Sequence, residues 1–245
     1  MIGEPSEKKG VSRFLSFIFG ELRRLVAVNL LFCACALPSA ATFALGLFGI
    51  YSRVSLPLSI ALAFPIGGAV AACYFCITMI LRDEPGYVWH DFWRKFKENA
   101  KQAALPGILC TAFIYAQAYL WGPFLYGGSV MDAGWMIVGV VMLVVFGMVA
   151  PFVFLQIAYI ELKTKKIIIN SLLLAFAHAP RSFMGAIMGG AIWVAFFLLM
   201  PGSLVAVPVI LLLGFSVSWL LDLMWIWPLV DRQFNINETL RERKR

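Results

Sequence analysis

Long apolar runs, separated by short polar connections, dominate the chain. Six of the runs are long enough to cross the ~30 Å of hydrocarbon in a bilayer as an α-helix that rises about 1.5 Å per residue. They cover residues 23–48, 57–81, 103–122, 134–160, 183–200 and 204–228. Several connections contain Gly and Pro, which are typical of turns. We therefore predict an all-α polytopic membrane protein with six transmembrane helices arranged as three hairpins.

The polar stretch between the second and third runs has a periodicity of its own. It reads GYVWHDFWRKFKENAKQ over residues 86–102, and four aromatic residues recur there at helical spacing, opposite a charged face. These are Trp89, Phe92, Trp93 and Phe96. The pattern predicts an amphipathic helix that lies in the plane of the membrane interface. Packing of the same aromatic stripe against the transmembrane helices is the alternative interpretation.

A similar apolar spacing precedes the first and fifth runs, which suggests a threefold repeat. The three spacings begin at residues 11, 89 and 169, and a cation follows twelve residues after each start, at Arg23, Lys101 and Arg181. The predicted units are 11–81, 89–160 and 169–228. Each consists of an in-plane helix on the cytoplasmic side followed by a transmembrane hairpin. Three units in one orientation imply a pseudo-threefold axis along the membrane normal.

Composition bears on the number of domains. The chain is 62% hydrophobic and 13% charged, with a mean hydropathy of +0.87. A soluble domain needs more polar surface than this. We therefore predict a single membrane domain over residues 1–245, with a cytoplasmic tail at 229–245. The first run is longer than the apolar core of a signal peptide, so we expect it to remain as the first span.

The positions of Lys and Arg predict the orientation in the membrane. Of the 20 basic residues, 19 flank the runs on one side, and Arg53 is the exception. The positive-inside rule then places both termini in the cytoplasm. The net charge of +7 suits the anionic inner leaflet, so membrane lipid is an expected partner. Nucleic acid is not expected, because the cations are spread over four segments that flank the membrane.

Asp222 is the most informative polar residue inside a predicted span. It lies in SVSWLLDLMWIW, about six residues from the cytoplasmic end of the sixth run, and therefore ~9 Å deep. A carboxylate inside a bilayer costs about 2.5–3.5 kcal/mol, so it needs a partner or a wet cavity. One interpretation is a proton-linked or substrate-linked site. The other is an ion pair with a cation at the inner rim, for which the candidates are Arg181, Lys163 and Arg24.

Three amides also fall inside predicted spans, namely Asn29, Gln117 and Gln156. Interhelical hydrogen bonds are the usual role of such residues, and a polar pathway through the membrane is the alternative. The five cysteines all lie in apolar runs, where packing is the expected role. A lone histidine cannot form a metal site without partner ligands, and the two histidines, His90 and His178, lie in separate loops. No metal or cofactor is predicted.

Familiar catalytic motifs are absent from the sequence. It contains no HExxH, GxSxG or GxxxxGK[ST] motif, and no paired carboxylates inside a predicted span. We therefore do not expect an enzyme. Because the phosphate-binding motif is missing, any ATP-driven role would have to take its energy from another subunit.

Several phrases of the sequence resemble the YesL-like family (DUF624) of bacterial integral membrane proteins, whose function is unassigned. The resemblance rests on NLLFCACALP at 29–38, LRDEPGYVWHDFWRKFKENAKQAALPGIL at 81–109 and LLLAFAHAPRS at 172–182. Trp89 and Trp93 stand where family members often carry Phe. The resemblance implies a multi-pass protein of the bacterial cytoplasmic membrane. Because family members are often encoded beside carbohydrate ABC importers, it also implies an accessory or interaction subunit, with permease or ATPase subunits as partners. An independent small-solute transporter or channel is the alternative.

Overall fold

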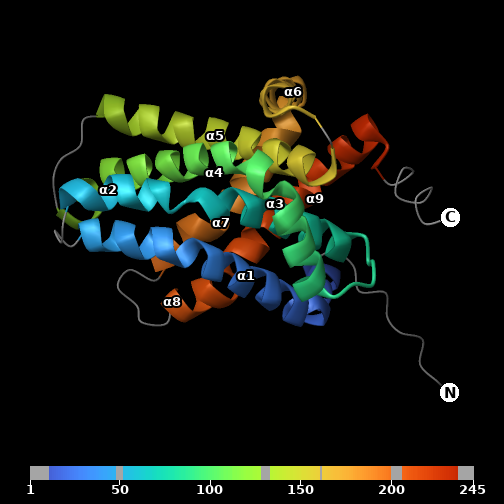
Figure 1. Ribbon diagram of the computed structural model, residues 1–245. Coiled ribbons are helices and arrows are strands. Elements are labelled where there is room, and N and C mark those ends of the chain that lie inside the picture. The colour runs from blue at the N-terminus through green and yellow to red at the C-terminus, as the bar shows by residue number, and fades with distance from the viewer. Residues whose placement is uncertain (1–10, 48–51, 128–132, 161, 200–205, 237–245) are drawn as a thin grey trace, which may run out of the picture.

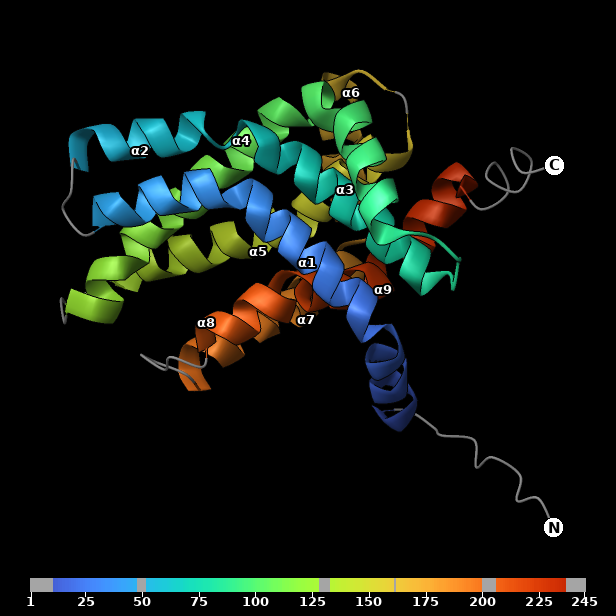
Figure 2. The same ribbon diagram turned by 60° about the horizontal axis from the view of Figure 1, so that its bottom comes forward.

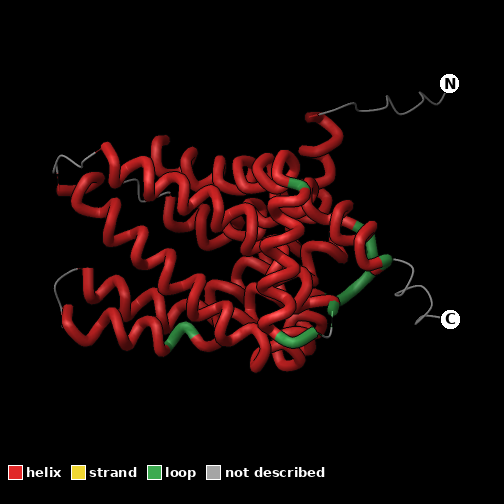
Figure 3. The backbone as a smooth tube through the Cα atoms, turned by 90° about the horizontal axis from the view of Figure 1, so that it is seen from above, coloured by secondary structure: helices red, strands yellow, loops and turns green. Residues whose placement is uncertain are grey.

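The structure is a computed structural model that describes residues 11–47, 52–127, 133–160, 162–199 and 206–236. These residues form helices and short loops, with no strand (Figures 1 and 3). The helices are α1 (Val11–Leu47), α2 (Ser52–Ala61), α3 (Phe64–Leu81), α4 (Val88–Gly127), α5 (Ala133–Tyr159), α6 (Thr164–Ala177), α7 (Ala179–Leu199), α8 (Ala206–Val209), the π-helix η1 (Ile210–Gly214) and α9 (Phe215–Phe234).

The prediction of an all-α, multi-pass membrane protein is confirmed. Five of the described helices are long and apolar enough to cross a membrane, and a sixth span is obtained if α6 and α7 are counted together. Those two helices meet at an angle of 98°. A right angle of this kind is what an in-plane helix followed by a span requires. The three-hairpin arrangement and the in-plane helices stay predictions.

Two predicted boundaries are wrong. The second span was expected as one helix over 57–81, but the chain leaves the helix at Leu62 and Ala63, between α2 and α3. The physical reason is Pro65, which has no N–H to donate to the carbonyl one turn earlier. The amphipathic stretch 86–102 was expected as a helix separate from the third span, but both belong to α4. Figure 1 shows that α4 changes direction along its length.

The helices are arranged around α1 and α3. Figure 2 shows α2 and α3 above α1, and α7 with α8 below it. The first residues of α1 and the last residues of α9 lie at the same end of the bundle, called the terminal end below (Figure 1). In α3, 13 of the 18 residues are buried, because α1, α4, α5 and α9 all pack against it. This helix is the centre of the core.

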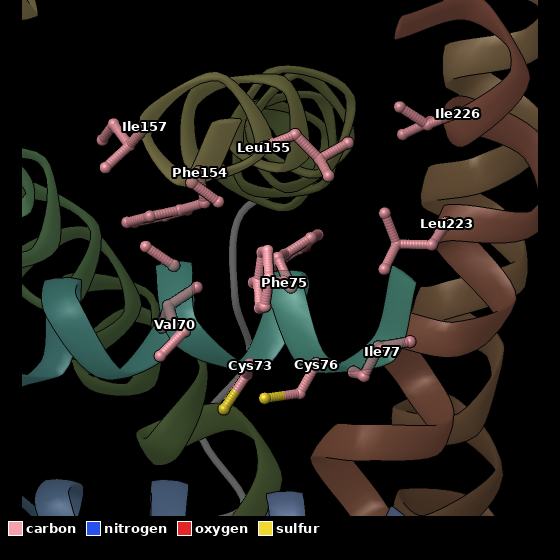
Figure 4. Close-up of a cluster of buried hydrophobic side chains, with 14 of the residues drawn as sticks. Val70, Cys73, Phe75, Cys76, Ile77, Phe154, Leu155, Ile157, Leu223 and Ile226 are labelled. Atoms are coloured by element: carbon pink, nitrogen blue, oxygen red, sulfur yellow. The ribbon is translucent and has the colours of Figure 1, made fainter. Parts of the chain in front are cut away.

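The core around α3 is filled by aliphatic and aromatic side chains. Figure 4 shows Phe75 of α3 directed toward Leu155 of α5, and Ile77 directed toward Leu223 of α9. The sulfur atoms of Cys73 and Cys76 lie on the other side of α3 (Figure 4), and both residues are buried as free thiols.

The closest helix contact is the crossing of α3 and α4. A Cβ atom added to Gly67 would overlap the backbone of Ala103, and one added to Gly107 would overlap the backbone of Gly67. Backbones approach this closely only where side chains are absent, as is common between membrane helices. The crossing therefore holds α3 and α4 together with no side chain between their backbones.

Candidate functional site

The crossing of α7 and α9 is another close contact of glycine with a neighbouring helix, and it contains the buried carboxyl group of Asp222. A Cβ atom on Gly185 would lie 2.7 Å from Oδ1 of Asp222, and one on Gly189 would lie 3.2 Å from Cβ of Asp222. The two glycines are four residues apart and therefore share one face of α7. They make the space that Asp222 occupies.

Asp222 has one polar partner among the described residues. Its side chain is buried, with 5% of the residue exposed, and Tyr74 of α3 donates a hydrogen bond from its hydroxyl to Oδ2 at 3.4 Å. The other carboxyl oxygen, Oδ1, is buried and has no hydrogen-bond partner in the part of the chain that the structure describes. Buried polar atoms without partners are rare in folded proteins. This oxygen therefore marks the position as a candidate site.

The structure does not show the ion pair that was one interpretation of Asp222. Within the described residues, none of the three candidate cations forms a salt bridge with it. Arg24 instead pairs with Glu21 at 3.0 Å and donates a hydrogen bond to the backbone carbonyl of Glu84. Arg181 is exposed. Asp222 thus lies among apolar groups without a compensating positive charge.

A serine and a tryptophan complete the polar contacts between α7 and α9. Ser218, one turn before Asp222, donates to the carbonyl of Gly189 at 2.7 Å and accepts from the indole N–H of Trp193 at 3.1 Å. On the next face of α9, the ring of Trp219 lies 5.6 Å from the ring of Tyr74 and 4.8 Å from that of Phe32. Trp219 thus packs beside the tyrosine that contacts Asp222, and Phe154 of α5 lies 6.3 Å from the same tyrosine ring.

The three predicted amides lie apart from one another. Asn29 is fully buried and bonds to the backbone of η1 and α9, as an interhelical role predicts. Gln156 donates to Ser171 of α6 at 2.9 Å, and its buried side-chain oxygen has no hydrogen-bond partner among the residues that the structure describes. Gln117 accepts from Trp121 of its own helix at 3.0 Å. Within the described residues, no hydrogen bond joins any two of these amides or joins one to Asp222.

The aromatic stripe of α4 packs mainly against protein. Phe92 is fully buried, Trp93 and Phe96 are half-buried, and only Trp89 is largely exposed, at 68%. The ring of Phe96 lies beside Gly68 of α3. The interface interpretation is therefore wrong for Phe92, for which the packing alternative holds. The three cations at the feet of the spans, Arg23, Lys101 and Arg181, are exposed.

Sequence reasoning missed the environment of Arg82 at the end of α3. Its guanidinium group pairs with Glu84 at 3.2 Å and lies over the rings of Tyr159 and Trp227, at 5.7 and 5.3 Å from their centroids. Tyr159 also hydrogen-bonds Thr78 of α3. The position of Arg82, directly after a buried apolar run, was the one feature of the sequence that could have indicated this environment. Its aromatic partners are distant in the sequence and were not predictable.

This fold, with its buried central helix and apolar outer surface, defines a multi-pass α-helical membrane protein. Residues 25–119 match a protein family described as "Protein of unknown function, DUF624". The predicted family resemblance is confirmed by this match, which runs from α1 into α4 and includes Asn29, Tyr74 and the aromatic stripe, but not Asp222. No curated protein and no solved structure matches the chain.

Proposed function

We propose that this chain is a non-catalytic integral membrane protein of the bacterial cytoplasmic membrane, an accessory or interaction subunit of a carbohydrate ABC importer. In this proposal the terminal end of the bundle faces the cytoplasm. The partners are the permease or ATPase subunits of the importer. Family members are encoded beside such importers, and this chain carries no phosphate-binding motif of its own.

One observation carries the interaction role. Tyr87 and Trp89 are 86% and 68% exposed at the terminal end, whereas Phe92, one turn further along α4, is fully buried. Tyr87 directly precedes α4 and Trp89 lies in its first turn. Exposed aromatic side chains at the start of a firmly packed helix are typical of contact surfaces, because little conformational entropy is lost when a partner covers them.

The test is purification from the native host in a mild detergent. The wild-type protein is expected to retain permease or ATPase subunits, and a Tyr87→Ala/Trp89→Ala variant is expected to lose them. Trp135→Ala is the matched control, because Trp135 is 62% exposed at the start of α5, toward the opposite end of the bundle. A wild-type protein that purifies without importer subunits from a host expressing them would refute the proposal.

An independent small-solute transporter is the second candidate, and the unpartnered oxygen of Asp222 favours it. Buried ionisable groups in membrane proteins often lie on transport or proton pathways. The test is the uptake of labelled mono- and disaccharides into liposomes, with and without a pH gradient. Transport by the wild type that Asp222→Asn abolishes and Gln117→Leu leaves intact would support this candidate. Absence of uptake by the wild type would reject it for these sugars.

A further inference from the structure

The π-helix η1, at Ile210–Gly214, interrupts the regular hydrogen bonding of the sixth span. Bonding from i to i+5 in place of i to i+4 adds one residue to the turn. At the change, backbone carbonyl and N–H groups are left without their α-helical partners. In a membrane no water replaces them, so protein groups must supply the missing hydrogen bonds. A π-turn in a span therefore requires a polar partner.

Asn29 of α1 is that partner. Its side-chain amide donates to the carbonyl of Ile210 at 3.0 Å and to that of Leu211 at 2.6 Å. Its side-chain oxygen accepts from the backbone N–H of Ser216 at 2.9 Å. One side chain thus satisfies three backbone groups on both sides of the extra residue. Asn29 is fully buried while it does so.

The π-turn determines which face of α9 meets its neighbours. An α-helix winds by ~100° per residue, so winding the extra residue into a regular helix would turn α9 by ~100° away from its observed orientation, whereas the wide π-turn takes up that residue without this rotation. After the π-turn, Phe215 lies 4.7 Å from Phe32 of α1, measured between ring centroids. In the same register, Ser218 and Asp222 face the two glycines of α7, and Asp222 meets Tyr74.

We propose that Asn29 is a positioning residue for Asp222. By stabilising the π-turn, it holds α9 in the rotation that places the carboxyl group against Gly185 and Tyr74. Asn29 and Asp222 form no hydrogen bond with each other, so the effect is transmitted along the helix. This coupling between α1 and the candidate site does not depend on whether the protein is an accessory subunit or a transporter.

The first test removes the side chain of Asn29 and the extra residue of the π-turn, first separately and then together. Asn29→Leu is expected to lower Tm in detergent by on the order of 5 °C, because three backbone groups lose their hydrogen bonds. Deletion of Leu212, whose side chain is exposed, restores a regular helix that needs no side-chain partner. In the wild type the deletion is expected to lower Tm, because the buried amide of Asn29 loses the backbone groups that it binds. In Asn29→Leu the deletion is expected to raise Tm, because it removes the backbone groups that lack a partner.

The sign of the deletion effect decides this test. A deletion that lowers Tm in both backgrounds would overturn the proposal. If Asn29→Leu yields no folded protein, the readout becomes recovery of a monodisperse size-exclusion peak when Leu212 is also deleted. In that case, failure to recover the peak would overturn the proposal as well.

The second test separates positioning from a purely structural role. Distant residues without shared partners normally have additive effects on stability. If Asn29 sets the rotation of Asp222, then Asn29→Leu and Asp222→Asn will be non-additive, because the carboxyl group has already lost its position in the first variant. Asn29→Leu with Gln117→Leu is the control pair and is expected to be additive. Additivity in both pairs would leave Asn29 as a local structural residue and overturn the positioning role.

Discussion

Two of the close helix contacts at glycine residues differ in the groups that they bring together. At the crossing of α3 and α4, Gly67 and Gly107 bring backbone against backbone. At the crossing of α7 and α9, Gly185 and Gly189 leave room for the side chain of Asp222 and contacts with Ser218. The first crossing is purely steric. The second is a polar site. Glycine therefore allows close backbone packing at one crossing and the burial of a carboxyl group at the other.

The largest expected effect is at the steric crossing. Gly107→Leu forces a side chain into the backbone of Gly67, which cannot move without separating α3 from α4. We expect a loss of more than about 4 kcal/mol and no monodisperse peak in size-exclusion chromatography. Gly122→Leu is the matched control on the same helix, because a Cβ atom there meets nothing within 4 Å. Normal folding of Gly107→Leu would contradict the backbone contact.

A smaller loss is expected at the polar crossing. Gly185→Ala places a methyl group against the carboxyl oxygen of Asp222, which can rotate away only into apolar surroundings. We expect a loss of about 1–3 kcal/mol in thermal or denaturant unfolding. Gly190→Ala, which meets nothing within 4 Å, corrects for the better helix propensity of alanine. Adding Asp222→Ala is expected to restore part of the loss. If it restores nothing, the clash is not with the carboxyl group.

The hydrogen bonds of Ser218 give the next effect. Ser218→Ala leaves the carbonyl of Gly189 and the indole N–H of Trp193 without their shared partner. We expect a loss of about 1 kcal/mol in the free energy of unfolding. Ser182→Ala on α7 is the control, because that hydroxyl bonds to the carbonyl of His178, four residues earlier on its own chain. Equal losses in the two variants would show that the interhelical bonds add nothing.

The smallest effect is expected for the hydroxyl of Tyr74. Its bond to Asp222 is long, and the aromatic contacts of the ring remain in Tyr74→Phe. We expect a loss of about 0.6 kcal/mol, an average value for hydrogen bonds between membrane helices. Tyr119→Phe is the control, because Tyr119 is 40% exposed. A loss larger than that of Gly185→Ala would make the tyrosine the main support of the carboxyl group.

The helical spans could be predicted from the sequence because run length and apolarity alone decide whether a segment crosses a bilayer. The break before Pro65 was also predictable in principle, since proline removes a helical hydrogen bond. Asn29 and Asp222 stood out because polar groups are rare in such runs. The partners of these residues were not predictable. Tyr74 is 148 residues from Asp222, and the π-turn that Asn29 contacts has no local signature in ILLLG.

The aromatic stripe shows a second limit of periodicity. Four aromatic residues on one face indicate an apolar environment but do not say whether it is lipid or protein. The packing of Phe92 and the exposure of Trp89 depend on how α4 bends over α3, which the glycines at 67 and 107 allow. The threefold repeat stays a prediction. Two of its three in-plane segments are continuous with the following span, in α1 and α4, and the third is set off by the 98° bend.

The burial of α3 has a consequence for how the protein is made. In its most apolar stretch, 72% of the residues are enclosed by other parts of the chain, so the finished helix meets little lipid. During synthesis, however, each span enters the bilayer before its later neighbours exist. The hydrophobicity of α3 is therefore needed more for its insertion into the membrane than for its environment in the folded protein. Tyr74 can form its hydrogen bond with Asp222 only after α9, which follows the other described spans in the sequence, has been inserted.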